Sequence, residues 1–143
     1  MKKLKLILPL TLLILGGGLY AMVLAKPAEE DPKVDGDVYV LPKEFVLNLA
    51  DGRYAKLSVG LVLEKGQLAA EEGHGTKPPE GYGPLPQEAL VRDIVTDVLT
   101  SADGETLIDR RGRRRLKKRI LKSIHKATDV HVEQVLFTDV AVQ

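Results

Sequence analysis

An uncharged apolar stretch close to the N-terminus constrains this chain more than any other feature. It runs from Leu6 to Ala25. As an α-helix, about 20 residues would be roughly 30 Å long, which is the thickness of the hydrocarbon core of a bilayer. Three lysines precede it: Lys2, Lys3 and Lys5. Because positive charge favours the cytoplasmic side of a membrane, we predict a cytoplasmic stub over residues 1–5, a transmembrane helix over 6–25 and an outer C-terminal part.

A cleaved signal peptide is the alternative interpretation of this stretch, since Val23 and Ala25 would suit a small-residue cleavage site before Lys26. The apolar region of a signal peptide is shorter, about 7–15 residues, so we favour a retained anchor. Gly17, Ala21 and Ala25 recur four residues apart on one face of the predicted helix. Small residues at this spacing let membrane helices pack closely, although they are also common in such helices without that role.

The chain beyond the anchor divides into a linker and one domain. Residues 26–36 contain two prolines, four acidic residues and a glycine, which is typical of a tether. Residues 37–143 are enough for one hydrophobic core. The chain has no cysteine, which excludes disulfides, cysteine-bound zinc, thiol catalysis and a lipid anchor on cysteine. Aromatic residues make up 4% of the chain and tryptophan is absent, so stacking surfaces for bases or sugars are scarce.

Alternating apolar residues predict a β-hairpin at the start of this domain. The alternation covers Phe45, Leu47 and Leu49 before the turn, and Leu57, Val59, Leu61 and Leu63 after it. Asp51-Gly52 stands between the two runs, and glycine accepts the positive φ of a primed turn. One face of the hairpin is apolar and the other is polar. We therefore expect another layer of the domain to pack against the apolar face only.

Helices and a closing strand follow the hairpin. Residues 66–86 are rich in glycine and proline, and we expect them to be disordered, with a functional loop as the alternative. Apolar residues at helical spacing predict helices over 86–100 and 113–127, with a break at Asp103-Gly104, a short helical turn over 105–109 and an interruption at Gly112. Their apolar positions are Leu90, Val91, Ile94, Val95, Val98 and Leu99, and then Leu116, Ile120, Leu121 and Ile124. Residues 130–142 predict a strand with a bulge near Glu133-Gln134. The order strand, strand, helix, helix, strand predicts an α+β fold.

A search for catalytic or metal-binding residues yields no candidate. His74, His125 and His131 have no carboxylate or second histidine at metal-ligand spacing. Asp93 and Asp97 lie one helical turn apart, but a solvated helix face explains them better than an acid–base pair. We therefore expect no enzyme activity, no catalytic residue, no metal, no cofactor and no small-molecule substrate.

The second predicted helix is strongly basic. Ten Lys and Arg residues and no acidic residue lie between Arg110 and Lys126. Outside the three cytoplasmic lysines, the chain carries 18 positive against 20 negative charges, a net charge of −2. Nucleic acid is excluded as a partner by the predicted location outside the cell membrane, which leaves acidic protein surfaces and lipid headgroups. We predict that the basic side chains form a partner or self-assembly surface, and its candidate residues are Arg110, Arg111, Arg114, Arg115, Lys118 and Lys122. The alternative is a solvated helix face whose long side chains cover the edges of the core.

Three segments of the domain resemble a known family. They are residues 38–54 (Val38-Tyr39-Val40-Leu41-Pro42-Lys43-Glu44-Phe45-Val46-Leu47-Asn48-Leu49-Ala50-Asp51-Gly52-Arg53-Tyr54), Arg92-Asp93-Ile94, and residues 135–143 (Val135-Leu136-Phe137-Thr138-Asp139-Val140-Ala141-Val142-Gln143). Together they resemble the flagellar basal body-associated FliL family over nearly the whole outer domain. The chain departs from the family pattern in its long Gly/Pro insertion and in its strongly basic second helix, which puts the interface details in question.

The resemblance implies a single-pass inner-membrane protein of the flagellar basal body, with a periplasmic domain similar to the stomatin/prohibitin fold. It also implies association with ion-driven stator units, assembly into homo-oligomeric rings, and support of flagellar rotation, swimming or swarming. No catalytic residues come with the family. The alternative function is a membrane-tethered periplasmic adaptor, or a stomatin-like scaffold unrelated to motility.

Overall fold

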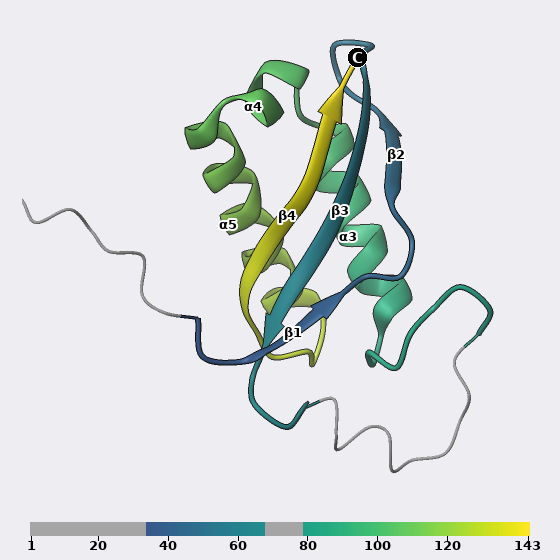
Figure 1. Ribbon diagram of the computed structural model, residues 1–143, viewed down its shortest axis with the longest axis vertical. Coiled ribbons are helices and arrows are strands. Elements are labelled where there is room, and N and C mark those ends of the chain that lie inside the picture. The colour runs from purple at the N-terminus through teal and green to yellow at the C-terminus, as the bar shows by residue number, and fades with distance from the viewer. Residues whose placement is uncertain (1–33, 68–78) are drawn as a thin grey trace, which may run out of the picture. The chain divides into compact units, whose positions relative to one another are not determined.

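A computed structural model describes residues 34–67 and 79–143 (Figure 1). These residues form four strands, β1 (Asp37–Val40), β2 (Phe45–Asn48), β3 (Tyr54–Leu63) and β4 (Val132–Val142), and three helices, α3 (Glu88–Thr100), α4 (Gly104–Ile108) and α5 (Arg110–Ala127). The α+β class is therefore confirmed. The predicted membrane helix, with Gly17, Ala21 and Ala25, and most of the linker lie outside the described residues. In the part that is described, no helix is long and apolar enough to cross a membrane.

The strand β3 is the centre of the antiparallel sheet, because every other strand pairs with it. The strand β4 pairs with β3 over almost its whole length, from Ala55↔Val142 to Leu63↔Val132. The short strands β1 and β2 share the opposite edge: β1 pairs with the C-terminal part of β3 and β2 with its N-terminal part. The sequence predicted β2, β3 and β4. It missed β1, which lies directly after the expected linker.

The predicted hairpin is confirmed, but its turn has a different geometry. Gly52 has a positive φ of 82°, as expected, whereas Asp51 does not. The N–H of Gly52 donates to the carbonyl of Leu49, and the N–H of Leu49 donates to the carbonyl of Arg53. This is a three-residue turn closed by a glycine bulge rather than a two-residue primed turn. The turn leaves the carboxyl group of Asp51 available for contacts outside the hairpin.

The strand β4 contains two irregularities, one of which was predicted. The pairings Val62↔Gln134 and Leu63↔Val132 leave Glu133 as the extra residue, so the bulge lies where the sequence indicated. A second shift in register falls between Leu57 and Val59. Bulges bend a long edge strand and increase its twist, which lets β4 curve along the helices.

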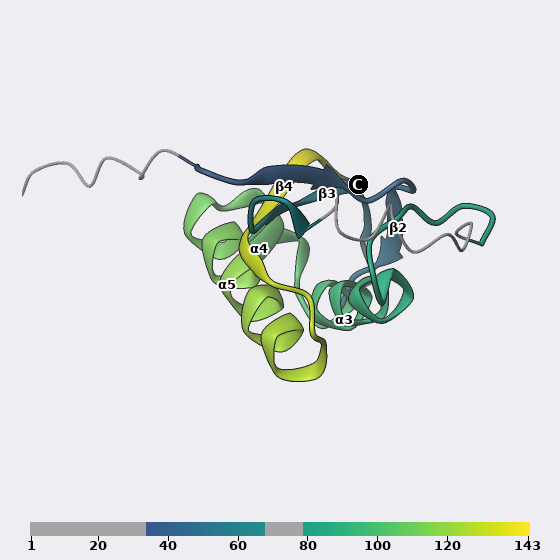
Figure 2. The same cartoon turned by 90° about the horizontal axis from the view of Figure 1, so that it is seen from below.

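All three helices cover the same face of the sheet (Figure 2). The core between the two layers contains Leu57, Val59, Leu61 and Leu63 from β3. It is completed by Val91, Val95 and Leu99 from α3, Leu107 from α4, and Leu116, Ile120 and Ile124 from α5. Leu90 is an exception to the predicted stripe of α3, because 40% of its surface is exposed.

The observed helix boundaries correct two predictions. Pro86 does not begin α3, since Gln87 adopts a left-handed conformation (φ 53°) and the helix begins at Glu88. Gly112 does not interrupt α5, which begins at Arg110 and has the side chain of Asp109 as its N-cap, accepting from the N–H of Gly112. The glycine is needed for packing: a Cβ at position 112 would collide with the backbone carbonyl of Thr106 in α4.

The segment before α3 is ordered, contrary to the prediction of disorder where it covers residues 79–86. Leu85 is buried in the core. The N–H of Tyr82 donates to the carbonyl of Pro79, and the N–H of Gly83 donates to Glu88. The remainder of the Gly/Pro-rich stretch, residues 68–78, lies outside the described residues.

Candidate functional site

The basic surface predicted from the sequence lies on α5, facing away from the core. The stripe formed by Leu116, Ile120 and Ile124 is buried, as predicted. All six candidate residues are exposed: Arg110, Arg111, Arg114, Arg115, Lys118 and Lys122. We call these six residues the basic face. Helical periodicity produces this separation, because residues three and four apart share one side of the helix.

No carboxylate within residues 34–67 and 79–143 forms an ion pair with the basic face. The ion pairs of this part of the protein are Arg53–Asp51, Lys56–Glu44 and Lys65–Asp35, all on the strands and their turns. The six cations therefore repel one another, and an acidic partner would relieve that repulsion. Within the described residues, the basic face is therefore an exposed surface of one sign of charge.

Two other basic residues of α5 have structural contacts. The guanidinium of Arg113 donates to the carbonyls of Leu107 (2.9 Å) and Ile108 (2.6 Å), and so satisfies the C-terminal end of α4. Arg119 donates to the hydroxyl of Ser101 at 3.2 Å. These contacts separate Arg113 and Arg119 from the basic face, a distinction that charge counting along the sequence cannot make.

Asp93 and Asp97 lie on the outer side of α3. Asp93 and Asp97 are exposed, while the neighbouring Arg92 points toward β2. Its guanidinium lies 4.4 Å from the centroid of the Phe45 ring and donates to the carbonyl of Lys43 at 3.0 Å. The exposure of both carboxyl groups agrees with the interpretation of Asp93 and Asp97 as part of a solvated helix face. In the described part of the chain, no group of three or more His, Cys, Asp or Glu side chains could hold a metal ion.

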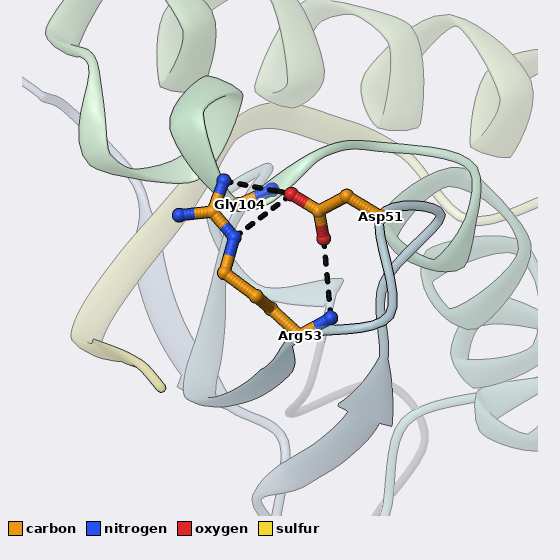
Figure 3. A network of polar contacts seen from close by, with 3 residues as sticks. All are labelled: Asp51, Arg53 and Gly104. Carbon is orange, nitrogen blue, oxygen red and sulfur yellow. Dashed lines mark hydrogen bonds and ion pairs between the residues drawn. The ribbon is translucent and has the colours of Figure 1, made fainter.

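A polar network connects the hairpin turn to the first turn of α4 (Figure 3). The Oδ2 atom of Asp51 accepts from Arg53 Nε at 2.8 Å and from the N–H of Gly104 at 2.9 Å. Its Oδ1 atom accepts from the N–H of Arg53 at 3.2 Å. The bond from Ala50 N–H to the carbonyl of Ala102 (3.0 Å) reinforces the same junction. The network fixes where α4 begins, and therefore also where α5 and its basic face lie against the sheet.

The Asp51 network should make stability depend on pH in the acid range. The hydrogen bonds from Arg53 and Gly104 lower the pKa of Asp51 from 3.8 to about 2. Its contribution is therefore fully present above pH 4 and is lost as the pH falls from about 4 toward 2. We expect Asp51→Asn to lower the urea midpoint of a fragment of residues 34–143 at pH 7, and the difference from wild type to shrink toward pH 2. In Asp93→Asn, an exposed control, the difference should be small at both pH values; a constant deficit in Asp51→Asn would contradict the linkage.

A second network is buried and was not foreseen from the sequence. Glu88 at the start of α3 is only 3% exposed. Its Oε2 atom accepts from the hydroxyl of Tyr39 in β1 at 2.6 Å and from the N–H of Gly83 at 2.8 Å. Burial and the Glu88 carboxyl group raise the pKa of the Tyr39 phenol well above its ordinary value, so the phenol remains a donor. The three groups hold β1, the segment before α3 and α3 together.

Comparison with known proteins identifies a family that matches this domain over almost its whole length. The model of the family "Flagellar basal body-associated protein FliL" matches residues 38–143, from β1 to the last residue. The chain is also similar to a protein of Aquifex aeolicus (strain VF5) named "Flagellar protein FliL". The two are 31% identical over 121 residues, which cover 82% of this chain and 67% of the relative. The chain therefore belongs to the FliL family of flagellar basal body-associated proteins.

Proposed function

We propose that this protein is a non-enzymatic component of the flagellar motor, which associates with the ion-driven stator units and supports rotation. The observation that carries the proposal is the family match, because it extends over the whole domain rather than over one motif. The sequence has no group of residues with the spacing of a catalytic or metal-binding site, which is compatible with a role that depends on binding. Binding to an active conformation of the stator would raise the population of that conformation, which is how a non-catalytic partner supports torque.

The proposal includes a membrane anchor over residues 6–25, with the stub 1–5 in the cytoplasm, the linker 26–36 and the domain 37–143 in the periplasm. Its support is the uncharged stretch from Leu6 to Ala25 and the lysines that precede it. The stripe of Gly17, Ala21 and Ala25 would let anchors pack against one another or against stator helices. Anchoring confines the domains to a surface, which strengthens weak contacts between them through effective concentration.

The basic face is the proposed contact surface for an acidic neighbour, either another copy of the protein or the stator. Six exposed cations without ion-pair partners in the described residues support this assignment. Exposed acids elsewhere on the same domain provide charge of opposite sign: Asp93 and Asp97 on α3, and Glu44, which pairs with Lys56. Contacts between two different surfaces of one protein are heterologous, and such contacts form rings when the rotation closes.

Charge reversal on the basic face tests this proposal. We expect R114E/K118E/K122E to leave the fold intact, because these side chains point away from the core stripe. Exposed ion pairs contribute about 0.2–1 kcal/mol each, so three reversals should weaken assembly by roughly tenfold or more. Chemical cross-linking in membranes would measure assembly, co-purification in mild detergent would measure stator association, and swimming speed would measure function.

The matched control is R114K/K118R/K122R, which keeps every charge and should assemble and swim normally. Raising the salt concentration should reproduce the assembly defect in the wild-type protein, since exposed charges are screened. If the reversed variant cross-links, co-purifies with stator units and swims like wild type, the basic face is only a solvated surface. If the wild-type protein co-purifies with no motor component, the alternative of a general periplasmic adaptor gains support.

A further inference from the structure

Three Asp-Gly pairs lie in the described part of the chain: Asp35-Gly36, Asp51-Gly52 and Asp103-Gly104. Asp-Gly is the aspartate dipeptide that isomerises most readily, because glycine has no Cβ to hinder the attack of its main-chain nitrogen and reaches conformations closed to other residues. The three pairs share the same local chemistry. How fast each one reacts therefore depends on how firmly the fold holds its carboxyl group and the nitrogen of its glycine.

The isomerisation exchanges one main-chain bond for another without an oxidant or a reductant. The amide nitrogen of the glycine gives up its proton and forms a bond to Cγ of the aspartate, and a carboxyl oxygen leaves as water. The product is a five-membered succinimide ring. Water then opens the ring at the main-chain carbonyl, which leaves isoaspartate, with the chain continuing through Cβ and Cγ. One water is lost and one is gained, so the residue keeps its composition and its charge.

The pair Asp103-Gly104 is held at the start of α4. The N–H of Gly104 donates to Asp51 Oδ2 at 2.9 Å, so the attacking nitrogen is already engaged (Figure 3). The carbonyl of Asp103 accepts from the N–H of Thr106 at 3.0 Å, and Asp103 has an extended ψ of 153°. A Cβ at Gly104 would meet the guanidinium of Arg53 at 2.6 Å, so this side chain covers the glycine. Because ring closure needs ψ to leave the extended and helical regions, this peptide unit reacts only after local opening.

The pair Asp51-Gly52 is held by the hairpin turn and by the same network. The N–H of Gly52 donates to the carbonyl of Leu49 at 3.0 Å. Both oxygens of the Asp51 carboxyl group accept hydrogen bonds, Oδ1 from the N–H of Arg53 and Oδ2 from Arg53 Nε and the N–H of Gly104. These bonds, chiefly that of the Arg53 side chain, lower the pKa of Asp51 to about 2. The group is therefore a carboxylate at neutral pH, and a carboxylate is a weaker electrophile than a neutral acid. One carboxyl group thus contacts the reacting atoms of two Asp-Gly pairs, its own and the one at α4.

The pair Asp35-Gly36 has no comparable contacts within the described residues. The Asp35 side chain is 77% exposed, and its contact there is an ion pair with Lys65, whose side chain is 66% exposed. Exposed pairs of this kind restrain a side chain only weakly. The N–H of Gly36 donates no hydrogen bond to any group of residues 34–67 and 79–143. In this part of the protein, neither the carboxyl group nor the nitrogen of the pair is held in place.

We propose that Asp35-Gly36 is the site at which this domain is modified by isoaspartate formation, and that the Asp51 network protects the other two pairs. Isomerisation at Asp35 adds one carbon to the main chain two residues before β1. Space there is tight, because a Cβ at Gly36 would collide with the carbonyl of Leu63. The lengthened chain cannot keep both this close approach and the ion pair with Lys65 unchanged. The product is a domain whose hairpin and helices are intact but whose first strand is loosened.

Tryptic peptide mapping tests the inference, since each pair falls in a peptide of its own: residues 34–43, 44–53 and 93–110. The full chain in detergent is incubated for several weeks at neutral pH and physiological temperature. Isoaspartate is then quantified by electron-transfer fragmentation, which also separates Asp35 from Asp37. We expect isoaspartate to accumulate at Asp35 roughly tenfold faster or more than at Asp51 or Asp103, because the held pairs react only through local opening. In guanidinium chloride the three rates should converge.

Substitution of Asp51 separates local protection from general stability. D51A frees the N–H of Gly104 and should raise isoaspartate at Asp103 several-fold, while the rate at Asp35 stays unchanged. Y39F weakens the domain away from this junction, so it is the matched control and should leave Asp103 slow. D35E keeps the charge but would need a less favourable six-membered ring. Its peptide 34–43 should therefore show only background signal.

Three results would overturn the proposal. The first is a rate at Asp35 in the folded protein that is no higher than the rates at Asp51 and Asp103. The second is a D51A variant in which Asp103 stays as slow as in the wild type. The third is a Y39F variant that accelerates Asp103 as much as D51A does, which would assign the effect to global unfolding. Circular dichroism checks the fold of each variant, and if D51A does not fold, the comparison of the wild-type sites in the folded and unfolded protein decides alone.

Discussion

Replacing Gly112 by alanine is expected to destabilise the domain severely, although the same exchange inside an exposed helix normally stabilises by about 1 kcal/mol. The reason is the close approach of α4 to the first turn of α5. An added Cβ would collide with the carbonyl oxygen of Thr106 and lie 2.9 Å from its Cα. Backbone cannot move aside as a side chain can, so we expect a loss of about 3 kcal/mol or more. Urea unfolding of a fragment of residues 34–143 would measure it.

Gly60→Ala is the matched control for Gly112→Ala. A Cβ at Gly60 would lie 3.5 Å from Cβ of Leu136, which is an ordinary contact. Since alanine also restricts the unfolded chain, this variant should be unchanged or more stable by about 0.4–1 kcal/mol. If Gly112→Ala were as stable as Gly60→Ala, the two helices would have room to separate, and the tight α4–α5 corner would have no structural importance.

Removal of the Glu88 carboxyl group is the second change with a large expected effect. In Glu88→Ala the hydroxyl of Tyr39 and the N–H of Gly83 lose their acceptor. A buried donor without a partner costs about 1–3 kcal/mol, so we expect a loss of about 3 kcal/mol in the free energy of unfolding. Tyr39→Phe removes one donor and should cost less. A double-mutant cycle with both changes should give a coupling energy of about 1 kcal/mol or more.

Glu44→Ala is the control for Glu88→Ala, because it removes an exposed glutamate whose ion pair with Lys56 is on the surface. Such pairs contribute about 0–1 kcal/mol. Equal effects of the two alanine variants, or additive effects of Tyr39→Phe and Glu88→Ala, would show that the buried network contributes no more than a surface contact. The Oε1 atom of Glu88 is buried and has no partner within the described chain, so Glu88→Gln should fall between wild type and Glu88→Ala.

Local patterns in the sequence predicted much of the fold. Alternation around Asp51-Gly52 identified the hairpin, and the phase slip near Glu133 identified the bulge in β4. The strand β1 was missed because it has four residues and follows a Pro- and acid-rich stretch, so its alternation is too short to stand out. Its pairing with the distant end of β3 stabilises it, and that is tertiary information.

Glycine and one leucine show where periodicity is insufficient. Glycine is typical of a helix break, so the sequence predicted an interruption at Gly112. The structure has this glycine inside α5, where the close approach of α4 leaves no room for a side chain. Leu90 fits the apolar spacing of α3, yet it is exposed because the core stripe of that helix is formed by Val91, Val95 and Leu99. In both cases the deciding quantity is the position of a neighbouring element, which a single periodic pattern does not contain.

The basic face was predictable because charge and helical spacing are both local properties. The structural role of Arg113 was not, because its partners are backbone carbonyls of α4 that bear no sequence signature. The pair of Tyr39 and Glu88 is separated by 49 residues. Only the tertiary fold, which brings the start of α3 within reach of the Tyr39 hydroxyl, joins these two side chains. A lone glutamate at a helix start otherwise indicates a favourable interaction with the helix dipole.

The central position of β3 has a consequence for the order in which the domain folds. Its pairing with β2 needs only a short turn to close, so the hairpin can form early. Pairing with β4 must wait until the Gly/Pro-rich residues 66–86 and the helices α3, α4 and α5 have been synthesised. Non-local pairing of this kind slows folding. Until β4 arrives, one edge of β3 is an unpaired template for other chains. The interval between synthesis of the hairpin and synthesis of β4 is therefore when this protein is most exposed to aggregation.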